Sequence, residues 1–432
     1  MNAKALIIAT GDNTQITSSK SHFAVELLKK PLINWVIDVV RTTGIVDICV
    51  VADKRNEESI KPLVGDCEFV VVKNNTSFKE QLKSVKALSG YEGNLLVIDA
   101  DSALVTPFIL FELISACEND KAACSVLVSD EECECECGCG CVDEECEYDS
   151  ACGVFCFNAK MLLALDFDEE EKRPTDAVNA FFDEGEKCKA FMCNDDSIDI
   201  KIENCSDLAY ATHLMQCSIN EYWMESGVTM LDPSTVWIGP DVKLQPDTEI
   251  LPMTMLWGDT KIGKCCIVGP NTRLSNVKAG DDCVLDETIG FDSVIENGVN
   301  CGPRCYLRAG SHLLNNSKAG TCVEIKNSTV GEGSKVPHLS YVGDTVIGKE
   351  CNLGAGTITC NYDGKNKHQT YIGDNAFIGS SSMLVAPVNV GSGACVGALS
   401  AITKDVPDDA LAIERSEQKH IEGWTKRKHQ KK

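Results

Sequence analysis

A group of polar side chains in the second half of this 432-residue chain has the residue types needed for acid–base chemistry on an anionic substrate. Arg308 and Lys326 together supply a bidentate fork and a point charge, two kinds of cation that hold a phosphate. His338 lies in the turn-like sequence VPHLSY, and an imidazole can take a proton from an attacking amine near neutral pH. The same region holds further polar candidates: Tyr341, Asn352, Asn361, Tyr362 and Lys367. Taken alone, such cations are more often solvated charges and a lone histidine is more often a surface or capping residue, so residue types only suggest a site.

A six-residue repeat runs through the segment that must position these side chains, from about residue 229 to residue 415. Residues of the repeat recur at this spacing in three phases: Ile238, Leu244, Ile250, Leu256, Ile262, Val268 and Leu274; then Ile289, Ile295, Cys301, Leu307 and Leu313; then Ile372, Ile378, Leu384, Val390, Val396 and Ile402. Neither a helix nor a flat sheet has this period, whereas the hexapeptide repeat of a parallel β-helix does, with three units per coil. We therefore expect a β-helix with these residues pointing inward. Arg308 and Lys326 are 18 residues, or one coil, apart, so they should stack on one face.

The repeat is interrupted once near its C-terminal end, between Leu353 and Ile372, which are 19 residues apart. The intervening sequence TITCNYDGKNKHQT (357–370) predicts a loop that leaves the solenoid, and such loops are usually functional. Residues 416–432 break the repeat again and form a basic tail.

The N-terminal 205 residues alternate strand-like and helix-like patterns. The expected strands are 5–10, 46–53, 67–73, 94–101 and 123–128, and the expected helices are 22–42, 55–64, 78–88 and 107–119. This rhythm predicts an α/β, Rossmann-like domain with a mostly parallel sheet and ligands at the carboxyl ends of its strands. Residues 206–228 are expected to form a linker helix.

Charge and composition exclude some classes of protein. A net charge of −25 argues against nucleic acid as a partner, because phosphate neutralisation needs a basic face. No stretch is apolar enough for a membrane span, and MNAKALIIATGD does not resemble a secretion signal, so we expect a cytoplasmic protein. In such a protein the 25 cysteines are expected as reduced thiols or metal ligands rather than disulfides.

Five cysteines alternate with other residues in EECECECGCGCVDEEC (131–146): Cys133, Cys135, Cys137, Cys139 and Cys141. Thiolates clustered in this way can bind zinc, copper(I) or an iron–sulfur centre. The segment lacks the C-x-x-C pairs of ordinary zinc sites, however, and its acidic residues raise thiol pKa values. A cysteine-rich surface insertion is therefore the favoured interpretation, and a soft-metal site is the alternative.

Two motifs carry a resemblance to a known family: GAGTITCNYDGKNKHQTYIGDNAFIGSSSMLVAPVNVG (354–391) and EGW (422–424). From about Val236 onward, the chain resembles the acetyltransferase half of the bifunctional glucosamine-1-phosphate acetyltransferase / N-acetylglucosamine-1-phosphate uridyltransferase family. The resemblance implies a left-handed β-helix that N-acetylates glucosamine-1-phosphate with acetyl-CoA as co-substrate. It also implies a role in UDP-N-acetylglucosamine and peptidoglycan synthesis, and a homotrimer with acetyl-CoA between neighbouring solenoids.

The resemblance also implies roles for individual residues. His338 is the implied general base, with Glu324 as a partner that orients it. The residues implied to bind the sugar phosphate are Arg308, Lys326, Tyr341, Asn352 and Lys367. Those implied to bind acetyl-CoA are Ala355, Asn361, Tyr362, Ser380, Ala398 and Arg415. The basic residues 426–428 either approach the phosphates of CoA or only solubilise the tail.

The first loop of the N-terminal half departs from the family's uridyltransferase motif. In IIATGDNTQITSSKSHF (7–23), Asn13 stands where the family has glycine, Gln15 where it has arginine, and His22 where it has lysine. Lys83 in EQLKS replaces a further glycine. Nucleotide phosphates need close backbone approach and cationic side chains, so these changes predict loss of uridyl transfer.

The family's magnesium position retains Asp101, but its second ligand position corresponds to Ser206 instead of asparagine. Magnesium is therefore expected only if this domain is active. Otherwise the domain serves folding, assembly or regulation. Two alternatives stay open: a fully bifunctional enzyme, with Lys20 replacing the missing lysine, and a non-catalytic trimeric assembly or regulatory protein.

Overall fold

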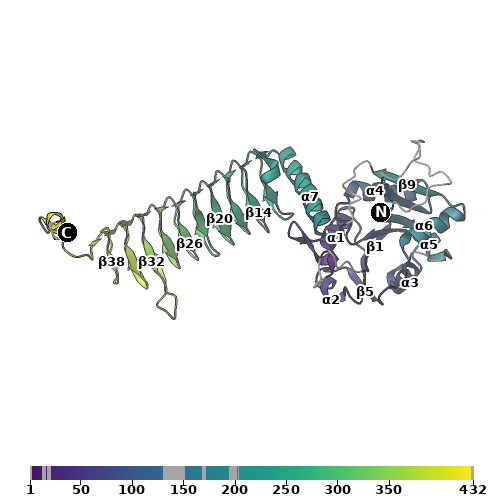
Figure 1. Cartoon of the computed structure of the whole chain (residues 1–432), viewed down its shortest axis with the longest axis horizontal. Coiled ribbons are helices and arrows are strands. Elements are labelled where there is room, and N and C mark those ends of the chain that lie inside the picture. The colour runs from purple at the N-terminus through teal and green to yellow at the C-terminus, as the bar shows by residue number, and fades with distance from the viewer. Residues whose placement is uncertain are drawn as a thin grey trace. The chain divides into compact units, whose positions relative to one another are not determined.

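The computed structural model of the chain describes residues 2–11, 16, 21–129, 151–167, 172–193, 202 and 204–429. The chain divides into two compact units, Met1–Met215 and Gln216–Lys432, and the division falls within helix α7 (Cys205–Glu225) (Figure 1). Each unit is described by itself. Among the described residues, none of the helices combines the length and apolar character needed to cross a bilayer.

The first unit contains a seven-stranded sheet in the order β5-β4-β1-β6-β8-β7-β9. Its strands are β1 (Ala3–Ala9), β4 (Ile48–Asp53), β5 (Glu68–Val72), β6 (Asn94–Asp99), β7 (Cys124–Ser129), β8 (Ala151–Asn158) and β9 (Cys188–Cys193). β8 runs antiparallel to its neighbours β6 and β7, and the other pairs are parallel. The expected mostly parallel α/β sheet is therefore confirmed.

Helices cover both faces of this sheet because its central strands are apolar on both sides. Ile7 of β1 packs in a core with α1 (Leu32–Thr42), α2 (Glu57–Ile60) and α4 (Pro107–Asn119). Leu6 packs in a second core. The helices of that second face are α3 (Phe78–Ser84), α5 (Ala159–Ala164) and α6 (Pro174–Asp183).

The expected helix over 22–42 is wrong in its first half. His22–Ala24 form a 3₁₀ turn, and β2 (Glu26–Leu27) pairs antiparallel with β3 (Lys30–Pro31) before α1 begins. Leu28 and Lys29 both have positive φ angles, 50° and 64°, which build the two-residue turn of this hairpin. The other expected helices are α4, as predicted, and shorter pieces: α2, α3 and a 3₁₀ turn at Lys86–Leu88.

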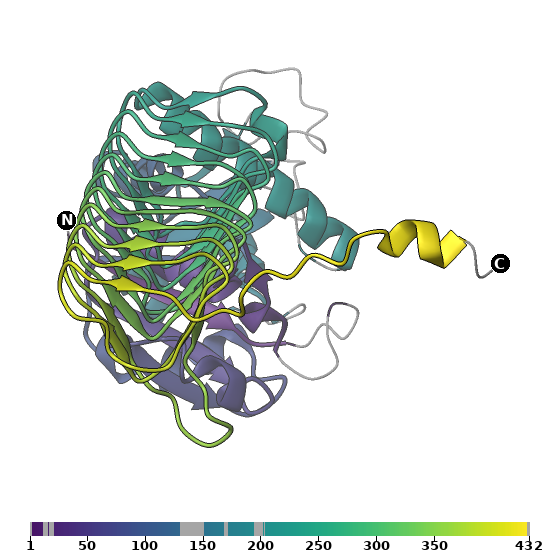
Figure 2. The same ribbon diagram turned by 90° about the vertical axis from the view of Figure 1, so that its left-hand side faces the viewer.

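The second unit is a left-handed β-helix whose coils stack on one another (Figure 2). Its three parallel sheets are named here after their first strands. The β10 sheet consists of β10 (Thr229–Met230), β13 (Glu249–Ile250), β16 (Ile267–Val268), β19 (Val284–Leu285), β22 (Asn300–Cys301), β25 (Lys318–Thr321), β28 (Lys335–His338), β31 (Asn352–Leu353), β34 (Phe377–Ile378), β37 (Cys395–Val396) and β39 (Leu411–Ala412).

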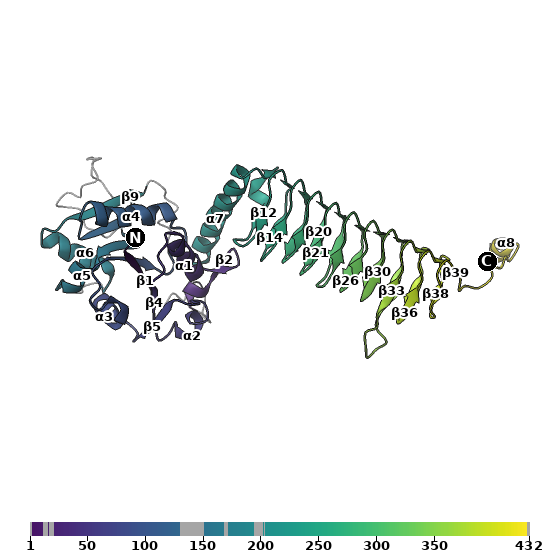
Figure 3. The ribbon, with the colours of Figure 1, turned by 180° about the vertical axis from the view of Figure 1, so that it is seen from behind.

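The β11 sheet consists of β11 (Trp237–Ile238), β14 (Met255–Trp257), β17 (Arg273–Ser275), β20 (Thr288–Phe291), β23 (Cys305–Leu307), β26 (Glu324–Lys326), β29 (Tyr341–Gly343), β32 (Ile358–Cys360), β35 (Met383–Val385) and β38 (Ala401–Ile402). The β12 sheet consists of β12 (Lys243–Leu244), β15 (Lys261–Ile262), β18 (Lys278–Ala279), β21 (Val294–Ile295), β24 (His312–Leu313), β27 (Thr329–Val330), β30 (Thr345–Ile347), β33 (Thr370–Ile372) and β36 (Val388–Val390). A loop projects from the coils between β32 and β33 (Figure 3), and a short helix, α8 (Trp424–His429), lies in the tail.

The repeat residues point into the solenoid as expected, with one exception. Every member of the first and third phases is buried, with at most 5 % of its surface exposed. In the second phase Ile289 is wrong: it is half-buried, and Gly290 faces inward as the register partner of Leu274. This coil is shorter than 18 residues, and a Cβ at Gly290 would lie 3.0 Å from a methyl carbon of Leu274. The phase therefore slips by one residue because a residue without a side chain fits there.

Buried hydroxyl and thiol groups join successive coils at one corner. Ser334 Oγ donates to the carbonyl of Gly348 at 2.6 Å and accepts from the amide of Cys351 at 2.8 Å. The Cys351 thiol in turn donates to the carbonyl of Gly373 at 3.0 Å. Part of the high cysteine content thus does the work of serine inside the β-helix, and all described cysteines are free.

Candidate active site

Arg308 and Lys326 lie on adjoining coils of the β11 sheet. Leu307 pairs with Ile325, and the amide of Arg308 donates to the carbonyl of Ile325 at 2.8 Å. Arg308 Nη1 donates to Glu324 Oε1 at 2.9 Å, and this hydrogen bond raises the pKa of Arg308. The predicted stacking of the two cations on one face is therefore present.

Asp344, which the sequence analysis missed, joins the cations to the projecting loop. Its Oδ1 accepts from Asn327 Nδ2 at 2.6 Å, and its Oδ2 accepts from Asn361 Nδ2 at 2.5 Å. Lys326 Nζ lies 3.9 Å from the same Oδ2. Burial alone would raise the pKa of Asp344, but the two amide hydrogen bonds and the charges of Lys326 and Lys367 hold it below its ordinary value.

Lys367 brings a third cation from the loop to this cluster. Contact with the Lys326 ammonium lowers the pKa of Lys367. The loop is closed at its base by a bridge between Tyr362 and Lys367, and the amide of His368 donates to the carbonyl of Asn361 at 2.8 Å. Two neighbouring ammonium groups share one buried carboxylate, so the local charge is positive and suits a doubly charged phosphate.

Tyr341 and Asn361 converge over Gly343. A Cβ on Gly343 would lie 2.5 Å from the Tyr341 hydroxyl and 2.7 Å from Asn361 Nδ2, so only glycine leaves room for both groups. A residue implied to bind the sugar phosphate therefore lies beside one implied to bind acetyl-CoA.

His338 ends β28 at the corner between the β10 and β11 sheets, and its side chain is exposed. Only Leu339 and Ser340 separate it from Tyr341 at the start of β29. The Glu324 carboxylate, implied to orient His338, accepts from Arg308 in this structure. Its orienting role stays a prediction.

The remaining residues implied to bind acetyl-CoA form a column along the same corner. The carbonyl of Ala355 accepts from the amide of Ser381 at 2.7 Å, and that of Ser380 from the amide of Leu399 at 2.9 Å. Arg415 Nη1 continues the column by donating to the carbonyl of Ala398 at 2.9 Å. Asn352, at the start of β31, pairs with Lys335 of the strand that ends at His338. The column therefore begins one coil beyond the imidazole.

In the N-terminal unit, His22 is buried, and its ring centroid lies 3.7 Å from that of Phe23. His22 Nε2 is 3.8 Å from Asp101 Oδ2, the carboxylate expected for magnesium. The described part of the chain holds no group of three or more His, Cys, Asp or Glu side chains suited to a metal, and the imidazole lies where a hydrated cation would need room. The residues present do not fit a magnesium site.

Other N-terminal candidates add little. Lys83 is exposed at the end of α3, and Ser206 lies in the first turn of α7, where its amide donates to Asn204 Oδ1 at 2.8 Å. Asn13, Gln15, Lys20 and the cysteine segment 131–146 lie outside the described residues.

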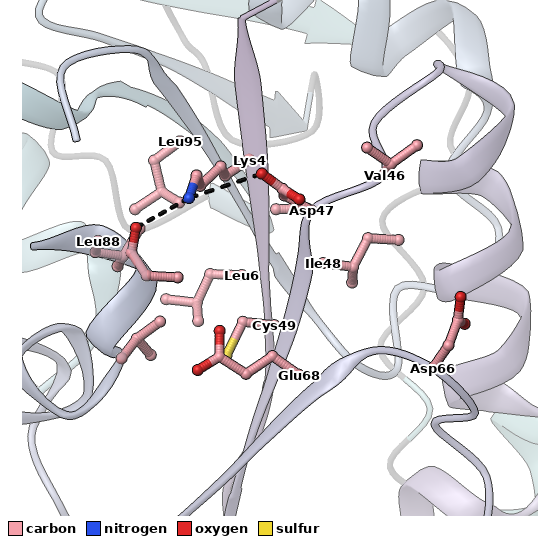
Figure 4. A pocket seen from close by; sticks show the side chains of 13 residues that line it. Lys4, Leu6, Val46, Asp47, Ile48, Cys49, Asp66, Glu68, Leu88 and Leu95 are labelled. Atoms are coloured by element: carbon pink, nitrogen blue, oxygen red, sulfur yellow. Dashed lines mark hydrogen bonds and ion pairs between the residues drawn. The ribbon is translucent and has the colours of Figure 1, made fainter.

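A cavity of about 260 Å³ lies at the amino ends of β1 and β4, away from the carboxyl ends where ligands of such sheets bind (Figure 4). Its polar groups satisfy one another: Lys4 Nζ donates to the carbonyl of Ala87 at 3.0 Å and lies 3.7 Å from Asp47. Burial raises the pKa of the Cys49 thiol in its wall to about 12, so this thiol is protonated and unreactive.

Comparison with known proteins covers both units. The family model of the MobA-like NTP transferase domain matches residues 5–179, and that of the hexapeptide repeat of succinyl-transferase matches residues 369–404. The bifunctional protein GlmU of Desulfitobacterium hafniense is 36 % identical over 446 residues, covering 98 % of each chain. The proteins of the same name from Syntrophomonas wolfei and Carboxydothermus hydrogenoformans are 33 % and 34 % identical, covering 98 % of this chain and 99 % and 100 % of theirs. The chain belongs to the bifunctional GlmU family.

Proposed function

We propose that the β-helix transfers an acetyl group from acetyl-CoA to the amine of glucosamine-1-phosphate, as a step in UDP-N-acetylglucosamine biosynthesis. The observation that carries this proposal is the cation cluster of Lys326 and Lys367 around Asp344, beside the corner column that starts next to His338. The cluster supplies charge for the sugar phosphate, and the column supplies backbone groups for the extended CoA chain.

In the proposed reaction the two substrates bind together, and transfer is direct. His338 takes a proton from the substrate ammonium, and the free amine attacks the thioester carbonyl carbon. The carbon–sulfur bond breaks, and the CoA thiolate leaves and takes up a proton. Backbone N–H groups of the column stabilise the oxyanion, and apposition of the substrates supplies much of the rate.

We propose a homotrimer in which a neighbouring chain covers the corner column. Large apolar side chains are exposed beside that column in a single chain: Leu339, Phe377, Leu399 and Leu411. Exposed apolar patches of this kind mark interaction surfaces. Light scattering coupled to size exclusion should give three times the mass of one chain, and a monomeric active enzyme would contradict the proposal.

The N-terminal unit is proposed to lack uridyl transfer. The His22–Asp101 contact supports this, as does the amide of Gly11, which donates to the Asp53 carboxylate at 3.1 Å instead of remaining free for a phosphate. The bifunctional names of the relatives favour the rival view that both activities persist. Magnesium-dependent turnover of UTP and N-acetylglucosamine-1-phosphate by the purified chain would establish the rival.

The test of acetyl transfer is release of CoA from acetyl-CoA in the presence of glucosamine-1-phosphate. His338→Ala should lower kcat by about 100-fold or more, as loss of a general base does. His312→Ala, at a histidine of the β12 sheet, is the matched control and should keep wild-type turnover. Equal turnover by both variants removes His338 from its role, and no CoA release by the wild-type trimer favours the non-catalytic assembly protein.

A further inference from the structure

Two cysteines far apart in sequence face each other in the N-terminal sheet. Cys124 of β7 and Cys188 of β9 are register partners in a parallel strand pair. Both side chains pack against the same core cluster, so both lie on the same face of the sheet. This pair takes no part in the acetyl transfer proposed above, and it lies outside the cysteine segment 131–146.

The backbone geometry suits a bond between the two sulfur atoms. Neighbouring strands are about 4.7–4.9 Å apart, and disulfides span Cα separations of about 4.4–6.8 Å. Cys188 is the first residue of β9, an edge strand, and it follows the exposed residues 183–187. An edge position next to an exposed turn allows the small backbone adjustment that a cross-strand disulfide requires.

The two thiols are also unequal in a way that thiol–disulfide exchange uses. Cys188 is half-buried, whereas Cys124 is fully buried. The hydrogen bond between them lowers the pKa of Cys188 and, together with burial, raises that of Cys124 well above its ordinary value. The reachable sulfur is therefore the better thiolate, and the buried one keeps its proton until a disulfide forms beside it.

Other neighbouring cysteine pairs lack this combination. Cys266 and Cys283 lie on adjoining coils inside the β-helix, both are at most 1 % exposed, and their thiols donate to backbone carbonyls. Cys117 and Cys156 are both buried, and the Cys117 thiol donates to the carbonyl of Cys156 at 3.2 Å. Neither pair offers a sulfur that a reagent in solution can reach.

We propose that Cys124 and Cys188 form a thiol–disulfide exchange site that accepts oxidising equivalents from a low-molecular-weight disulfide. The Cys188 thiolate attacks one sulfur of that disulfide, whose S–S bond breaks and releases one thiolate. Cys124 Sγ then attacks Cys188 Sγ, its proton passes to a released thiolate, and the second small thiolate leaves. Two protein thiols are oxidised, and one small disulfide is reduced to two thiols. The product ties edge strand β9 covalently to β7.

The test uses the reduced full-length protein, with oxidised glutathione as the probe under native conditions. Free thiols are alkylated at intervals, and peptides are mapped by mass spectrometry, which assigns each linkage separately from the thiols of residues 131–146. We expect a peptide linking Cys124 to Cys188 to appear first. Cys124→Ser should instead accumulate glutathione on Cys188, and Cys188→Ser should leave Cys124 reduced.

The pair Cys266 and Cys283 is the internal control and should stay reduced while the protein is folded. Two results would overturn the proposal: Cys124 and Cys188 remain fully alkylated after long exposure, or the control pair oxidises at the same rate, because that rate would report unfolding. Circular dichroism of the two serine variants checks that each folds, and a failed fold leaves the wild-type time course as the deciding measurement.

Discussion

Asp344→Asn tests whether the cation cluster depends on one buried carboxylate. The side chain is only 12 % exposed, accepts two amide hydrogen bonds and lies 3.9 Å from the Lys326 ammonium. Asparagine keeps the shape but loses the charge, and one of its two terminal atoms becomes a donor that faces another donor. We therefore expect the β-helix to lose stability in this variant.

The expected loss is about 2–3 kcal/mol at neutral pH. A hydrogen bond to a charged group contributes about 1.5–3 kcal/mol, and the variant loses one such bond outright. Coulomb's law gives an upper bound of about 4 kcal/mol for the ion pair at an effective dielectric constant of 20, most of which the cost of desolvation offsets. For a unit of this size, about 2 kcal/mol corresponds to a fall in Tm of roughly 4–8 °C.

The pH dependence gives the sharper test. The pKa of Asp344 is lowered in the folded state, so its stabilisation is present above the ordinary carboxyl pKa of about 3.9 and is lost as pH falls through the lower folded value. The difference in Tm between wild type and Asp344→Asn should thus be full at pH 7 and shrink below about pH 4. Calorimetry at matched protein concentration measures it, because assembly also shifts Tm.

Asp259→Asn is the control, since Asp259 forms an exposed ion pair with Lys261 at 3.1 Å. Its effect should stay within about 0.5 kcal/mol at any pH. A Tm for Asp344→Asn that matches this control at pH 7, or a deficit that persists unchanged in acid, would refute the assignment of Asp344 as the charged centre of the cluster.

Three further changes have defined outcomes. Gly302→Ala should destabilise the β-helix by about 3 kcal/mol or more, because φ is +98° and the new Cβ would lie 1.8 Å from the Asp286 carbonyl oxygen; Gly364→Ala, at φ +96° in open space, should cost only about 1 kcal/mol by thermal melting. Ser334→Ala should cost about 1–3 kcal/mol in the same assay, since it leaves a buried carbonyl and a buried amide unpaired, and Ser334→Cys should recover most of the loss. Lys367→Ala should raise KM for glucosamine-1-phosphate roughly tenfold with a smaller change in KM for acetyl-CoA, and equal changes in both would separate Lys367 from the phosphate.

The sequence alone determined the architecture, because a β-helix writes its period into the chain. Each inward residue must fill the same narrow interior, so aliphatic residues recur every sixth position, and a stack of coils brings residues about 18 apart, such as Arg308 and Lys326, to one face. Motif resemblance likewise led to the family. The slip at Ile289 went unseen because a coil can lose a residue when glycine replaces the inward side chain, and spacing alone does not reveal which coil does so.

Only the tertiary structure decided which charges meet. Asp344 belongs to no motif, and its contacts with Asn327, Asn361 and Lys326 join two coils and the base of a loop. The His22–Asp101 contact and the facing thiols of Cys124 and Cys188 likewise depend on strand order and register, which bring together residues more than 60 positions apart. Hydrogen bonds and ion pairs act over a few ångströms, whereas a linear pattern records only spacing along the chain.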